Sequence, residues 1–176
     1  MNIANSLTIL RIFLIPVFVF ILLIKIPYGD YLAALVFIAA ALTDSLDGYL
    51  ARKLRQVTKL GIILDPLADK LLITAALISL VELGAMPGWI AIVILGRELA
   101  VSGLRAVKAE EGIIIPASKM GKTKTVVQVV AVLLLILQSS YQHIVPLPLG
   151  EWAMYIAVII TVVSGIEYFY RFRMVE

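Results

Sequence analysis

Four aspartates lie close together in a stretch whose flanks are strongly apolar. Asp44 and Asp47 are three residues apart, and Asp65 and Asp69 are four residues apart. At about 3.6 residues per turn, either spacing places both carboxylates on one face of a helix. A short connection joins the two pairs, so we expect two antiparallel helices whose ends bring the four carboxylates together.

Carboxylates in such apolar surroundings need compensation, because one aspartate at a bilayer centre costs about 2.5–3.5 kcal/mol. Solvation at the interface explains one or two of them, and salt bridges to Arg52, Lys53 and Lys70 could neutralise part of the charge. A divalent cation compensates all four. The ligand set is all oxygen, without His or Cys, which suits Mg²⁺ or Mn²⁺ and not zinc. Four carboxylates could hold two ions and leave one carboxylate near a nucleophile.

Small residues share the two helix faces with the aspartates. Gly48 and Ala51 follow the first pair, and Gly61 precedes the second. Their lack of bulk would let a planar or phosphate-bearing ligand approach the backbone. Close packing of membrane helices explains them as well, and both readings can hold together.

The rest of the chain is membrane-like in composition. Of 176 residues, 62% are hydrophobic, and the mean hydropathy is +1.04. A span needs about 20 mostly apolar residues, and backbone groups in lipid must be satisfied within the segment, which favours helices. Six candidate spans follow: Leu7–Ile26, Tyr31–Leu50, Leu64–Leu83, Trp89–Val107, Val126–Ser140 and Trp152–Phe169. We therefore predict one all-α integral membrane domain over residues 1–176, with six transmembrane helices and a polar, metal-binding cavity open to the cytoplasmic side.

Basic residues set the predicted orientation. They gather between the second and third spans, between the fourth and fifth, and after the sixth, whereas the opposite loops carry only Lys25. The positive-inside rule then places both termini, the 52–59 loop and the 105–124 loop in the cytoplasm. The last of these contains the longest connection, from Glu110 to Lys124. These residues also favour anionic lipid headgroups and give no case for nucleic acid.

The absence of cysteine and the presence of a single histidine narrow the chemistry further. The chain has no cysteine, which excludes disulfide and thiolate chemistry. The lone His143 falls in a predicted loop and is expected to be solvated or interfacial.

The full spacing is Asp44-x2-Asp47-Gly48-x2-Ala51-Arg52-x8-Gly61-x3-Asp65-x3-Asp69. It resembles the signature of the CDP-alcohol phosphotransferase family at every fixed position. The resemblance implies an enzyme that binds a CDP-linked lipid through its diphosphate on metal. It implies that Asp44, Asp47 and Asp65 are the principal metal ligands, and that Asp69 shares the second ion and is the general base. It further implies that Gly48, Ala51 and Gly61 make room for the cytidine nucleotide and that Arg52 contacts the diphosphate.

Three other stretches bear on the acceptor alcohol. The segments "NIANSLTILRI", "ILGRELAVSGLRAVKAEEG" and "ASKMGKTKT" resemble the bacterial phosphatidylglycerophosphate synthase branch of the family. That resemblance implies CDP-diacylglycerol as donor, sn-glycerol 3-phosphate as acceptor, a homodimer and a place in the bacterial cytoplasmic (inner) membrane.

An acceptor phosphate needs basic contacts, and arginine matches phosphate in a bidentate manner. Arg105 is the first candidate, and the others are Lys119, Lys122, Lys124 and Arg11. The lysines could instead only set topology, Arg11 could snorkel to the headgroups, and Arg97 beside Glu98 could be an internal ion pair.

Two other functions stay open from the sequence. The first is the same transfer reaction with another acceptor alcohol. Inositol phosphate as acceptor would use the same basic site, whereas serine would not need a phosphate site. The second is a magnesium channel or transporter lined by the aspartates, which would conduct ions and release no CMP. The pattern of Gly48, Ala51, Arg52 and Gly61 argues against it, because a pore needs no small-residue site for a nucleotide.

Overall fold

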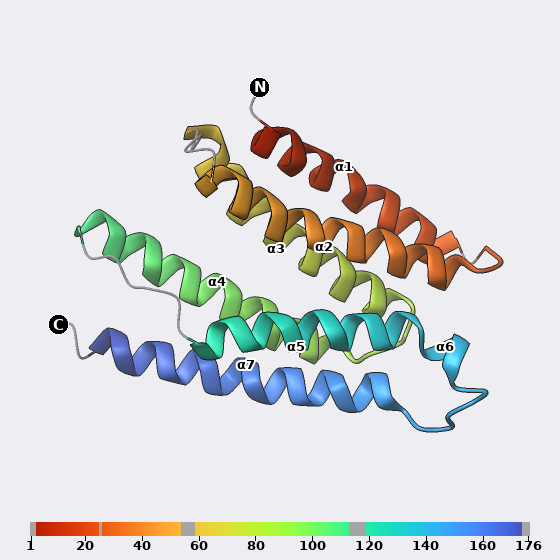
Figure 1. The fold of residues 1–176 in the computed structure, drawn as a ribbon. Coiled ribbons are helices and arrows are strands. Elements are labelled where there is room, and N and C mark those ends of the chain that lie inside the picture. The colour runs from red at the N-terminus through yellow and green to blue at the C-terminus, as the bar shows by residue number, and fades with distance from the viewer. Residues whose placement is uncertain (1–2, 25, 54–58, 113–118, 174–176) are drawn as a thin grey trace. The chain divides into compact units, whose positions relative to one another are not determined.

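A computed structural model describes residues 3–24, 26–53, 59–112 and 119–173. Side chains at 3–5, 44–53, 59–63, 65, 66, 119, 122 and 171–173 lie outside that description. All regular elements in the described ranges are α-helices (Figure 1), which confirms the all-α prediction. They are α1 (Ile3–Ile24), α2 (Gly29–Lys53), α3 (Lys59–Glu82), α4 (Gly88–Glu110), α5 (Lys119–Ile136), α6 (Gln138–Tyr141) and α7 (Leu149–Arg173). The chain divides into two compact units, Met1–Leu83 and Gly84–Glu176. The prediction of a single domain stays a prediction.

The first unit consists of α1, α2 and α3, with α1 packed against both other helices. The rings of Phe18 on α1 and Phe37 on α2 are both fully buried, and their centroids lie 5.5 Å apart. A tight turn at Tyr28, which has a φ of 60°, reverses the chain between α1 and α2. Because α2 and α3 run in opposite directions, the C-terminal end of α2 and the N-terminal end of α3 lie at the same end of this unit (Figure 1).

The second unit is built around α7, which packs against both α4 and α5. Its core contains the fully buried side chains of Ile94, Val132 and Met154. The short helix α6 was not predicted separately. It is tied to the start of α7 by the Gly150 N–H, which donates a hydrogen bond to the Tyr141 hydroxyl at 3.0 Å.

The outer faces of the helices are those of a membrane protein. Large apolar side chains on three helices point away from the protein interior, with 70% of Phe13, 73% of Ile92 and 62% of Ile159 exposed. Exposed apolar surface on this scale is rare on soluble monomers and marks contact with lipid or a partner. By length and composition, the segments Ser6–Ile24 and Leu149–Tyr170 could each cross a membrane.

The other four predicted spans are also helical, but the fifth, Val126–Ser140, is divided at Leu137 between α5 and α6. Each of the four carries charges or has a shorter apolar stretch. The apolar parts of α2 and α5 are limited to Gly29–Thr43 and Thr123–Ile136. Helix α3 includes Asp69 and Lys70, and α4 includes Arg97 and Glu98. The number of spans therefore stays a prediction.

The structure corrects one boundary that matters for the site. The sequence predicts a connection from Glu110 to Lys124, but α5 already begins at Lys119. Lysine has a good helix propensity, so the apolar stretch that starts at Val126 marks where the apolar surface begins and not where the helix begins.

Candidate functional site

The predicted metal-binding aspartates all lie on regular helix. Asp44 and Asp47 belong to α2, which continues without a break to Lys53, so their spacing is the helical i, i+3 that the sequence predicts. Asp65 and Asp69 belong to α3, which also continues without a break through Pro66. Helical backbone at all four positions is what a convergent carboxylate cluster requires.

The backbone brings the two aspartate-bearing helix ends to the same end of the first unit (Figure 1). Of the four side chains, the structure describes only that of Asp69, which is half-buried. The side chains of Asp44, Asp47 and Asp65 lie outside the described residues. The same holds for the surroundings of the predicted nucleotide site, which comprises Gly48, Ala51, Arg52 and Gly61. An all-oxygen donor set at one end of a helix pair suits a hard divalent cation. The metal assignment stays a prediction.

Arg11 lies in the same unit, and its position differs from the snorkelling expectation. The residue is fully buried, and its guanidinium Nε donates a hydrogen bond to the Thr43 hydroxyl of α2 at 3.2 Å. That hydroxyl in turn donates to the Ala40 carbonyl at 2.6 Å. Since Thr43 directly precedes Asp44, the contact fixes α1 against the turn of α2 that leads into the first aspartate. No local pattern pointed to Thr43, because its partner Arg11 is 32 residues away.

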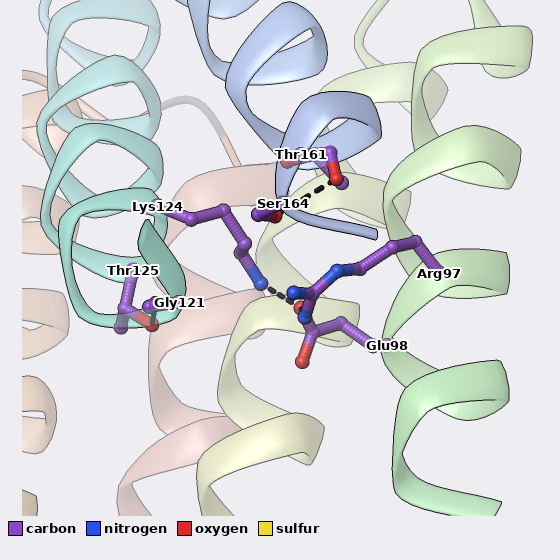
Figure 2. Close-up of polar contacts among 7 residues, drawn as sticks. All are labelled: Arg97, Glu98, Gly121, Lys124, Thr125, Thr161 and Ser164. Atoms are coloured by element: carbon purple, nitrogen blue, oxygen red, sulfur yellow. Dashed lines mark hydrogen bonds and ion pairs between the residues drawn. The ribbon is translucent and has the colours of Figure 1, made fainter. Parts of the chain in front are cut away.

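In the second unit, the expected ion pair between Arg97 and Glu98 is present. Arg97 Nη1 lies 3.4 Å from Glu98 Oε1. The structure adds a third member, because the ammonium of Lys124 on α5 also pairs with that carboxylate oxygen. Figure 2 shows both cations directed toward Glu98. The trio is largely buried, with side-chain exposures of 12% for Arg97, 22% for Glu98 and 5% for Lys124.

Helix α7 covers this trio with a polar and small-residue face. Thr161 and Ser164 are both fully buried, and the Ser164 hydroxyl donates to the Thr161 carbonyl at 2.9 Å (Figure 2). Gly165 lies directly against Arg97, since a Cβ at this glycine would come within 3.1 Å of Arg97 Cγ. The glycine thus gives the arginine stem the space that it occupies.

The remaining basic residues differ in accessibility. Arg105 on α4 is exposed. Lys108 is buried and pairs with Glu111 at 2.7 Å. Lys119 and Lys122 lie in the first turns of α5, and their side chains are outside the described residues. His143 is exposed in a turn, as expected.

Comparisons with known proteins agree with the resemblance. A family model described as CDP-alcohol phosphatidyltransferase matches residues 1–163. The chain is 46% identical over 180 residues to a Bacillus subtilis protein named CDP-diacylglycerol–glycerol-3-phosphate 3-phosphatidyltransferase, covering 96% of the chain and 93% of that protein. A Rickettsia bellii protein of the same name is 41% identical over 169 residues, with coverage of 96% and 93%. A Mycobacterium tuberculosis protein named probable phosphatidylglycerophosphate synthase is 40% identical over 178 residues, with coverage of 97% and 81%.

Proposed function

The chain belongs to the CDP-alcohol phosphatidyltransferase family, and we propose that it transfers the phosphatidyl group from CDP-diacylglycerol to sn-glycerol 3-phosphate. The products are phosphatidylglycerophosphate and CMP, so the enzyme acts in phospholipid synthesis. The observation that carries this assignment is the 46% identity over nearly the whole chain to the Bacillus subtilis protein whose name states this reaction.

The reaction exchanges one phosphorus–oxygen bond for another. The acceptor hydroxyl oxygen bonds to the lipid-side phosphorus, the bond from that phosphorus to the bridging oxygen breaks, and CMP leaves with that bonding pair. We assign the acceptor's proton to the Asp69 carboxylate. Phosphoryl-group chemistry depends mainly on positioning and charge neutralisation, so one well-placed base is enough.

Asp44, Asp47 and Asp65 are the residues we assign to hold Mg²⁺ or Mn²⁺, with Asp69 sharing the second of two ions. The bound metal would neutralise the diphosphate of the donor. A carboxylate between cations is a weaker base, because the positive charge lowers its pKa. A base in this cluster therefore has to be the carboxylate least engaged with metal, and we assign that place to Asp69.

The donor nucleotide would lie against the small residues of α2 and α3. Gly48 and Ala51 fall at i+1 and i+4 from Asp47 on continuous helix, and Gly61 falls one turn before Asp65. A cytidine ring can come near the helix backbone only where the side chains are small. Arg52 would supply a guanidinium group that binds the diphosphate.

For the acceptor phosphate we propose Arg105 as the principal contact, supported by Lys119 and Lys122. Arg105 is the one described residue of the predicted set that is exposed, and an exposed guanidinium is accessible to a soluble ligand. Lys124 and Arg11 are buried and already bonded within the protein, to Glu98 and Thr43. We place Lys124 behind the acceptor site and Arg11 beside the aspartates.

We further propose six spans in the bacterial cytoplasmic membrane, both termini in the cytoplasm, and a homodimer. The distribution of basic residues supports the orientation, and the exposed apolar faces of α1, α4 and α7 support contact with lipid or with a second copy. In this orientation the aspartates and the basic residues 105–124 all lie on the cytoplasmic side, where a soluble phosphorylated alcohol is available.

The proposed function is tested by offering the purified protein CDP-diacylglycerol and Mg²⁺ with glycerol 3-phosphate, inositol phosphate or serine in separate reactions. We expect CMP only with glycerol 3-phosphate. Release with none of the three would overturn the enzyme assignment. CMP release with serine alone would overturn the proposed acceptor-phosphate site. CMP release with inositol phosphate alone would show that inositol phosphate, and not glycerol 3-phosphate, is the acceptor.

A further inference from the structure

A largely buried group of charges lies in the second unit, the trio of Arg97, Glu98 and Lys124. It joins two helices that are linked in sequence by a long connection, because Arg97 and Glu98 lie on α4 and Lys124 lies on α5. Breaking a buried ion pair by removing one partner costs far more than breaking a surface pair, since the remaining charge stays in a poorly solvated place. Glu98 is the partner that the two cations share, so its loss removes one contact from each of them.

The position of Glu98 along α4 relates it to the proposed acceptor site. Glu98 and Arg105 are seven residues apart, which places them on the same helix face about 10 Å apart along the axis. On α5, Lys122 and Lys119 lie toward the N-terminus from Lys124. The chain reverses between α4 and α5 (Figure 1), so the basic residues of both helices extend from the trio toward the same end.

We propose that Glu98 is a positioning residue for the acceptor site. By holding Lys124 of α5 beside Arg97 of α4, it sets the register of the two helices and thereby the spacing between Arg105 and the α5 lysines. Gly165 of α7 completes the arrangement, because it leaves the space in which the Arg97 stem lies. This inference rests on the proposed function, since it concerns the acceptor of that reaction.

The test is a double-mutant cycle on the purified full-length protein, read as the KM for glycerol 3-phosphate and for CDP-diacylglycerol. Glu98→Gln keeps the size of the side chain and removes its charge. We expect the acceptor KM to rise about tenfold or more, as when one partner of a buried charge pair is lost, while the donor KM changes by less than about twofold. In a Lys124→Gln background the same change should add little, because the two residues act as a unit. Lys124→Arg, which keeps the cation, should retain most of the acceptor affinity.

The matched control is Glu111→Gln, which removes the carboxylate of a different ion pair, at the C-terminal end of α4. Glu111 is half-exposed and pairs with Lys108 within one helical turn, so its loss should leave both KM values within about twofold. Gly165→Ala is a second probe that alters no charge. The added Cβ would lie 3.1 Å from Arg97 Cγ, so the arginine side chain would have to shift. This shift should raise the acceptor KM several-fold and leave the donor KM unchanged.

The outcomes separate the inference from the function on which it rests. Absence of CMP release by the wild-type protein with glycerol 3-phosphate would overturn the proposed function. An active wild type in which Glu98→Gln behaves like Glu111→Gln would overturn the positioning role alone. A fall in acceptor KM would overturn it too, because it would mean that Glu98 only repels the phosphate. If Glu98→Gln does not fold, Gly165→Ala decides, and an unchanged acceptor KM in that variant counts against the proposal.

Discussion

The hydrogen bond between Arg11 and Thr43 makes the cost of removing one hydroxyl group calculable. Thr43→Val deletes the acceptor of the Arg11 Nε–H at 3.2 Å and leaves a fully buried guanidinium with one bond fewer. Side-chain hydrogen bonds between membrane helices contribute about 0.6 kcal/mol on average. Bonds to a charged group contribute about 1.5–3 kcal/mol. Because Arg11 is charged and buried, the second range decides, and we expect the free energy of unfolding to fall by about 2 kcal/mol.

The second unit supplies a matched control for this substitution. Thr161 is also a helical threonine and is fully buried, but its hydroxyl oxygen makes no hydrogen bond among the described residues. Thr161→Val should therefore leave the free energy of unfolding unchanged within about 0.5 kcal/mol or raise it slightly, since it removes an unsatisfied polar atom.

Both variants can be compared by denaturant titration in detergent, with Mg²⁺ titrated in the CMP-release assay. Because Thr43 directly precedes Asp44, we expect Thr43→Val to raise the Mg²⁺ concentration for half-maximal activity, whereas the acceptor KM stays near its wild-type value. Equal loss of stability in the two variants would refute the role of the Arg11 bond. If Thr43→Val raises only the acceptor KM, Arg11 belongs to the acceptor-phosphate site, as the sequence first suggested.

Four further substitutions test the site and the packing. Asp69→Asn should abolish turnover, because an amide cannot take the acceptor's proton, while CDP-diacylglycerol binding measured at equilibrium largely survives; near-normal turnover would show that Asp69 is not the base. Arg105→Ala should raise the acceptor KM at least about tenfold and leave the donor KM nearly unchanged, as for loss of a charge-assisted bond, and the reverse pattern would contradict the assignment. Gly150→Ala should destabilise the protein by more than about 1 kcal/mol, because its Cβ would lie 2.6 Å from Gln138 Oε1 and 3.0 Å from the Leu135 backbone. Gly96→Ala, which meets nothing within 4 Å, should stabilise helix α4 by about 0.5–1 kcal/mol, and equal unfolding midpoints for the two would contradict the packing.

Sequence patterns predicted the helices well where a long apolar block marks them, as in α1 and α7. They predicted the helical spacing of the aspartates too, because that spacing is local. Local patterns also suggested the pair of Arg97 and Glu98, which are neighbours in the chain. They did not identify Lys124 as its third member, since that contact depends on how α5 packs beside α4.

The predictions that were wrong also depended on local patterns alone. Hydropathy alone predicts a loop for the charged segment from Lys119 to Lys124, and this prediction was wrong. Lysine has a good helix propensity, so the segment extends α5. Arg11 near a predicted span end suggests snorkelling, and only the packing of α1 on α2 shows that Thr43 accepts its hydrogen bond. A contact between residues as far apart as Arg11 and Thr43 is decided by tertiary packing and leaves no periodic pattern in the sequence.

The buried Arg11 also bears on how the chain is made. An arginine within a span raises the cost of inserting that helix alone into the bilayer, by up to about 2.5–3.5 kcal/mol when the residue lies at the bilayer centre. Its described partner Thr43 is synthesised 32 residues later, near the end of the apolar part of α2. In the proposed six-span arrangement, α1 gains this contact only after α2 has emerged, so we expect the first two helices to enter the membrane as a hairpin and not one by one.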